Sequence, residues 1–299
     1  MSSSSDVITG EKLQELAMVY IGTVSDFAYN PRIRPQKNKQ FPLQTFSQID
    51  CFKNPPIVFC YSHRIAELAR WIHLFQHDFV LITHNSDHNI TEEVLQSIQP
   101  LVDSPRLLHW FAQNLCCHHE KLSLLPIGIA NSQWPHGDGH LFATLLPPPP
   151  AVPEKTKKTY FHFQTHTNLR LRNACYHALQ DRIPFLPAVS PKDNLQRLSE
   201  YEFCICPEGN GADTHRLWEC LYVKTIPIVL DGPFTRVLQR HGIPLVVLAS
   251  WEEYDESLLT YDSDGLAQWD PTWLSLCRFR EKIQGRISSQ DNASLVFLE

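Results

Sequence analysis

The chain has 299 residues, of which 43% are hydrophobic and 19% charged, enough apolar material for one large core or two ordinary ones. Lys and Arg number 26 against 32 Asp and Glu, a formal net charge of -6, so the overall field repels a nucleic-acid backbone and any anion site must be built locally. The composition therefore excludes a disordered chain and argues against general nucleic-acid binding.

The termini and the cysteines indicate the compartment. The first residues lack a basic region followed by an apolar run, and no uncharged apolar stretch reaches the roughly 18 residues of a membrane span. Nine cysteines are an odd number without a spaced framework, which favours free buried thiols. We expect a cytoplasmic protein with no membrane span.

The first half alternates short apolar runs, typical of buried strands, with runs of helical periodicity. The expected elements are a strand at 57–61, a helix at 65–77, a strand at 79–83, a helix at 107–115 and a strand at 124–128. This alternation predicts a parallel sheet covered by helices on both faces.

Four consecutive prolines at 147–150, followed by a polar stretch to 158, predict a stiff connection between domains. We place the boundary there, which divides the chain into domains at 1–150 and 151–299.

The alternation restarts in the second half. The expected elements are a strand at 159–163, a helix at 169–179, a strand at 203–206, a helix at 216–223, strands at 226–230 and 244–248, a helix opened by a capping box at 250–253, and a terminal helix at 273–287. The fold class predicted is α/β, with two halves of about equal size that face one another across a cleft. Functional residues are then expected in the loops after strands, because open parallel sheets bind ligands beyond the carboxyl ends of their strands.

The segment 203–229 is the most informative. Gly209 and Gly211 let the backbone approach a ligand closely, and a helix N-terminus near Asp213 and Thr214 favours an anion such as phosphate. Arg216 and Glu219 are three residues apart on this helix, a spacing suited to a diphosphate and the hydroxyls of a ribose. Taken alone, such a pair is usually a solvated salt bridge. Neither a phosphate-loop motif nor a dinucleotide-binding glycine motif is present.

Residues 209–229 resemble the donor-binding segment of exostosin-like glycosyltransferases, in which an Arg-x-x-Glu-Ala-Leu helix precedes a Gly-Cys-x-Pro-Val/Ile-Val strand. This chain has Cys220 for the alanine and Lys224-Thr225 for the Gly-Cys. Segments 82–87, 127–138 and 161–170 are similar to parts of small soluble enzymes of this kind from bacteria and large algal DNA viruses.

The resemblance implies the GT-B fold, in which two Rossmann-like domains face one another across a cleft, with an acceptor-side domain at 1–150 and a nucleotide-sugar-binding domain at 151–299. It also implies the transfer of a sugar from a nucleotide-diphosphate donor to a carbohydrate hydroxyl, with inversion and without a metal or other cofactor. The donor expected is a UDP-sugar, with UDP-xylose and UDP-hexoses both open. Arg216 would contact the diphosphate and Glu219 the ribose. Other expected donor-binding residues are Gly209, Gly211, Asp213, Thr214, His215, Thr165, Asn168 and Arg170, although Arg170 and Arg172 are equally typical of solvated helix charges.

Inverting transfer needs a base for the acceptor hydroxyl. Asp87 is the first candidate, because it lies in a polar loop after a first-half strand, and His136 and Asp138 are the alternates. An equally good interpretation has Asp87 cap the helix that begins near Thr91.

The histidines predict no metal site, because glycines and a proline break the helix that would align His136 with His140. Cys204 and Cys206 alternate along a strand, which packing explains better than ligation. Two other classes stay open: a nucleotide- or glycan-binding protein without catalysis, and a zinc-dependent hydrolase.

Overall fold

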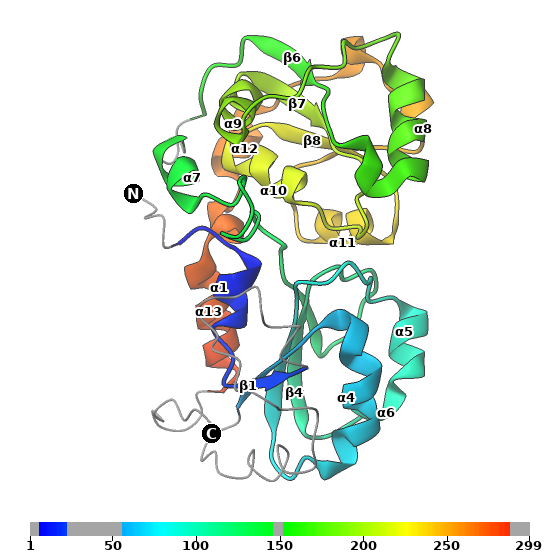
Figure 1. Cartoon of the computed structure of the whole chain (residues 1–299), viewed down its shortest axis with the longest axis vertical. Helices are drawn as coiled ribbons and strands as arrows, with labels where there is room; N and C mark the ends of the chain where they lie inside the picture. The colour runs from blue at the N-terminus through cyan, green and yellow to red at the C-terminus, as the bar shows by residue number, and fades with distance from the viewer. Residues whose placement is uncertain (1–5, 23–55, 146–151, 288–299) are drawn as a thin grey trace. The chain divides into compact units, whose positions relative to one another are not determined.

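The computed structural model describes residues 6–22, 56–145 and 152–287 and divides the chain into two compact units (Figure 1). The five-stranded unit comprises Thr9–Leu125 and Leu276–Glu299, and the four-stranded unit comprises Met1–Ile8 and Pro126–Ser275. The boundary expected at 147–150 lies outside the described residues.

The five-stranded unit is built on a parallel sheet whose strands follow one another in sequence order. The strands are β1 Val19–Ile21, β2 Ile57–Cys60, β3 Phe79–Thr83, β4 Leu107–Ala112 and β5 Leu122–Leu124. The helices are α1 Gly10–Gln14, α4 Ile65–Trp71, α5 Glu92–Ser97, α6 Gln99–Val102 and α13 Leu276–Gly285, with 3₁₀ turns η1 Ser62–Arg64 and η2 Ile72–Leu74. Every residue of β2 and β3 is buried, as expected for parallel strands covered on both faces.

The helix expected at 107–115 is wrong, because this segment forms β4, which pairs with β3 and β5. Five of its six residues are buried, and an apolar run buried on both faces carries no period that separates strand from helix. The crossover helices are instead α5 and α6, which precede it.

The four-stranded unit has a second parallel sheet, also in sequence order. Its strands are β6 Lys157–Tyr160, β7 Tyr201–Ile205, β8 Ile226–Leu230 and β9 Val246–Leu248. Its helices are α7 Gly139–Leu145, α8 Leu169–Leu179, α9 Pro191–Ser199, α10 His215–Tyr222, α11 Pro233–Arg240 and α12 Ser263–Gln268, with 3₁₀ turns η3 Thr165–Asn168, η4 Trp251–Glu253, η5 Glu256–Leu258 and η6 Pro271–Leu274. The capping box expected at 250–253 is wrong: η4 is three residues long and the Ser250 side chain makes no capping hydrogen bond.

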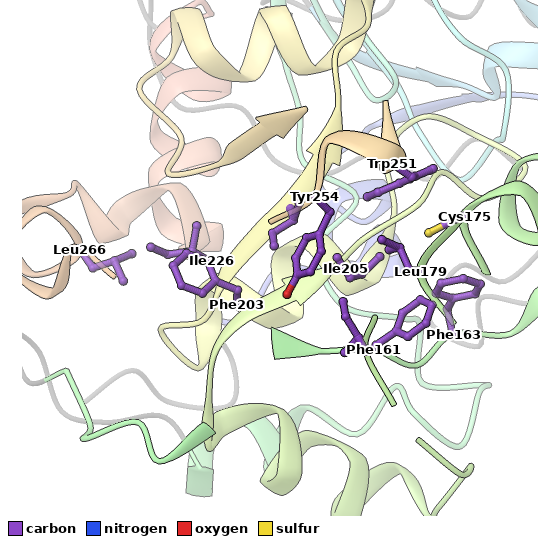
Figure 2. Close-up of a cluster of buried hydrophobic side chains, with 12 residues drawn as sticks. Phe161, Phe163, Cys175, Leu179, Phe203, Ile205, Ile226, Trp251, Tyr254 and Leu266 are labelled. Carbon is purple, nitrogen blue, oxygen red and sulfur yellow. The ribbon is translucent and has the colours of Figure 1, made fainter. Parts of the chain in front are cut away.

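An aromatic cluster forms the core on one face of this second sheet (Figure 2). Phe203 and Ile205 of β7 pack there with Cys175 and Leu179 of α8, all fully buried. Because side chains alternate along a strand, Cys204 points to the opposite face. The expected fold class is confirmed to this extent: an α/β chain with two all-parallel sheets, consistent with two Rossmann-like domains.

Candidate functional site

The loop between β7 and α10 is held close to the start of α8. The Asn168 side chain donates to the Gly209 carbonyl (2.7 Å) and accepts from the Leu171 N–H (3.2 Å), so it caps α8 and fixes the loop together. A Cβ at Gly209 would lie 3.3 Å from Nη2 of Arg172, so glycine permits this close approach. The expected donor residue Asn168 thus positions the loop.

Arg216 and Glu219 form a partly buried ion pair on the first turns of α10. Arg216 Nε donates to Glu219 Oε2 at 3.0 Å, and Nη1 donates to the His162 carbonyl at 2.9 Å. Their side chains are 20% and 9% exposed, against 48% and 41% for the surface pair Arg106–Asp78. The pair is therefore not the solvated salt bridge that its spacing also allowed.

A second guanidinium, that of Arg172, is near enough to Arg216 for the two charges to interact. Its Nε donates to the Glu208 carbonyl (3.0 Å) and its Nη1 to the Gln164 carbonyl (2.7 Å). Burial and the positive charge of Arg216 both lower the pKa of Arg172. Arg172, Arg216 and Glu219 together carry one net positive charge, which suits an anionic ligand.

The sequence had favoured Arg170 over Arg172. Arg170 is exposed. Its positive charge lowers the pKa of Glu208, against the larger effect of burial, which raises it. The available signal was spacing: Arg172 is four residues after Asn168, so both lie on the helix face nearest the glycine loop.

Asp213 holds the start of α10 against the segment that follows β5. Its carboxylate accepts from the Ile127 N–H (2.7 Å) and from the Trp218 indole N–H (2.6 Å). Burial raises the pKa of Asp213 to about 7, although these hydrogen bonds act in the opposite direction. His215 pairs with the Gly128 carbonyl through Nδ1 at 2.9 Å. Asp213 and His215, both expected to bind the donor, thus make hydrogen bonds to other residues of the same unit.

The remaining donor candidates lie along the same edge of the unit. Gly211 and Thr214 are buried in the loop, and Thr214 is the N-cap residue of α10. The half-buried Thr165 opens η3, the turn that leads into α8.

Asp87, the first candidate base, is an exposed residue of the loop after β3, in the five-stranded unit. The interpretation of Asp87 as a helix cap is wrong, because Thr91 caps α5 by accepting the Val94 N–H at 3.3 Å. Next to Asp87, the Ser86 hydroxyl lies 3.3 Å from Nδ1 of His63 and 3.4 Å from Nδ1 of His88. This His63–Ser86–His88 group was not predicted from the sequence, where its signal was that both histidines follow predicted strands.

The alternates, His136 and Asp138, belong to the four-stranded unit. Asp138 accepts the His140 N–H at 2.8 Å at the start of α7, a capping contact. The His136 ring lies between Trp134 and His215, with centroids 6.4 Å from each. Trp134 is 54% exposed.

Three buried thiols cluster near Arg216. Cys204, Cys206 and Cys220 have sulfur atoms within 4.8 Å of one another, and within the described ranges no other three potential metal ligands come so close together. Burial opposes ionisation of Cys204, but hydrogen bonds from the two other thiols and the charge of Arg216 outweigh it, and its pKa is lowered. The sequence had placed two of these thiols on one strand face, and the fold adds the third from α10.

Comparison with known proteins adds no relative: no protein-family model matches the sequence, and no curated protein matches it. Among the helices described, none is both long enough and apolar enough to cross a bilayer.

Proposed function

We propose that the four-stranded unit binds the nucleoside diphosphate part of a sugar donor, and that the protein transfers this sugar to a carbohydrate hydroxyl. One observation carries the proposal: a partly buried Arg216–Glu219 pair at the start of α10, with Arg172 beside it at the glycine loop. A partly buried excess of guanidinium charge next to a helix N-terminus favours a diphosphate.

Each residue of this group has a chemical part in the proposal. Arg216, Arg172 and the amides at the start of α10 would neutralise the diphosphate as it departs, which lowers the barrier to breaking the anomeric bond. Glu219 would accept hydrogen bonds from the ribose hydroxyls. Loop positioning by Asn168 and Asp213 would keep these groups in place before the donor arrives.

Asp87 is the proposed base for the acceptor hydroxyl. Its exposure leaves the carboxylate accessible to a substrate, and the adjacent His63–Ser86–His88 group offers imidazoles that could share the proton. Asp87→Asn preserves shape and removes the basic oxygen, so transfer should fall by ~10²-fold or more while donor affinity survives. His63→Gln is the matched variant that tells whether an imidazole takes this part.

Hydrolysis of a panel of UDP-sugars without added metal tests the proposal against its rivals. Release of UDP from one donor, faster with a carbohydrate acceptor and unchanged by a chelator, is the expected result. A binding protein without catalysis would give UDP affinity and no release. A zinc-dependent hydrolase would be stopped by the chelator. In the part of the chain that is described, no histidine has its ring nitrogen within 4.8 Å of two other potential metal ligands that are equally close to each other.

A further inference from the structure

The three thiols behind Arg216 form a cluster from two elements. Cys204 lies within β7, Cys206 directly follows this strand, and Cys220 lies on α10. They are 0%, 4% and 0% exposed, and the sulfur atoms of Cys206 and Cys220 are 3.7 Å apart.

The fold explains why the sulfurs converge. Side chains two apart on a strand share a face, so Cys204 and Cys206 both point away from the aromatic core. Cys220, on the helix that covers this face, completes a triangle with all sides within 4.8 Å. A metal bonded to sulfur at about 2.3 Å requires sulfur separations of about 3.8 to 4.0 Å, so only small side-chain adjustments are needed.

We propose that Cys204, Cys206 and Cys220 bind one monovalent copper ion through three sulfur ligands. Thiolates are soft ligands that select Cu⁺, zinc or iron–sulfur clusters. Structural zinc takes four protein ligands in a tetrahedron, and among the described residues the group holds three potential ligands. Three thiols and Cu⁺ give a Cu(SR)₃ centre of charge -2 and release three protons, with no change of oxidation state.

Arg216 offsets part of the charge of such a centre. Its guanidinium, which is paired with Glu219, also acts through its charge on the Cys204 sulfur, so it reduces the cost of burying the anionic centre without cancelling its charge. The proposal is independent of the proposed sugar transfer, because it needs neither a nucleotide nor activity.

The test is anaerobic titration of the reduced full-length protein with Cu⁺ in competition with bicinchoninate. We expect one Cu⁺ per chain to be withheld from the chelator, with X-ray absorption showing three sulfurs at about 2.3 Å. Cys204→Ser, Cys206→Ser and Cys220→Ser should each weaken retention at least tenfold. Cys175→Ser, a buried thiol of the same unit outside the cluster, is the matched control and should keep it.

A measurement on the unmutated protein covers the case in which a cluster variant fails to fold. Bound Cu⁺ should protect these three thiols, and not Cys175, from alkylation in mild denaturant, as read by peptide mass spectrometry. The proposal would be overturned if the wild type retained no Cu⁺ or if each of the three single variants retained it as tightly as the wild type. It would also be overturned if bound Cu⁺ protected other thiols in place of these three. Preferential retention of Zn²⁺ would overturn the assignment of the ion.

Discussion

Asp213→Asn tests how the start of α10 is held. The carboxylate accepts from two N–H groups, those of Ile127 and the Trp218 indole. An amide of the same shape can accept only one of them and turns its own N–H₂ toward the other, which costs about 1 to 3 kcal/mol. Urea unfolding of the purified variant and the wild type should show this loss at about pH 4.5, below the raised pKa of the carboxyl group.

The pH dependence of that difference gives the sharper test. Burial raises the pKa of Asp213 from 3.8 in the unfolded chain to about 7, so between these values the native state binds a proton that the unfolded state does not. Its contribution to stability is present at low pH and is lost as pH rises, by about 1.4 kcal/mol per pH unit and about 4 kcal/mol in all. The difference in unfolding free energy between the wild type and Asp213→Asn should therefore shrink as pH rises.

Asp231→Asn is the control, since this surface carboxylate pairs with Arg236 at 2.9 Å and its pKa is lowered, largely by that hydrogen bond. Its difference from wild type should not shrink as pH rises. A difference for Asp213→Asn that stays constant or grows between about pH 4.5 and pH 6.5 would refute the reasoning, because it would mean that the N–H donors keep the buried carboxylate ionised.

Three further predictions concern other residues. Burial, and to a lesser extent the charge of Arg286, lowers the pKa of His109 to about 4. Between pH 6.5 and pH 4 only the unfolded chain takes up this proton, so the free energy of unfolding should fall as pH falls through this range. His109→Gln should flatten this pH dependence in urea titrations. Asn168→Ala should cost about 1 kcal/mol in thermal melts and weaken UDP binding several-fold, whereas Ser190→Ala, which removes the cap of α9, should cost a similar amount and leave UDP binding unchanged. Trp134→Ala should raise the KM for the sugar-bearing substrate in transfer assays and leave UDP affinity within about twofold if the indole stacks on a sugar; an unchanged KM would remove Trp134 from the site.

Much of the fold could be predicted because its elements have distinct patterns. The strands at 79–83 and 226–230 and the helix at 169–179 match β3, β8 and α8 at both ends, since apolar runs and helical periodicity there are bounded by polar or turn residues. β4 could not be recognised, because burial on both faces removes the alternation that marks a strand. α9 was missed although Ser190 and Pro191 carry an N-cap and first-turn signal.

The candidate site was predictable only where it is local in sequence. Arg216 and Glu219 share one helix, so their spacing indicated a pair. Their burial depends on tertiary packing, which the spacing alone left open. Arg172 and Cys220 join their neighbours across separate elements, and no local pattern specifies such contacts. Asp213 was assigned to the ligand because the sequence gives no sign that the Ile127 N–H would occupy its carboxylate.

The most direct test of the proposed function is calorimetry of UDP and uridine on the same protein preparations. Arg216→Gln keeps a hydrogen-bond donor for Glu219 and removes the charge, so UDP affinity should fall about 10- to 100-fold while uridine affinity changes by less than about threefold. Glu219→Gln should weaken both ligands, and Arg236→Gln, an exposed arginine of the same unit, should weaken neither. Absence of UDP binding to the folded wild type, or equal UDP affinity in all four proteins, would contradict the assignment of the donor site to α10.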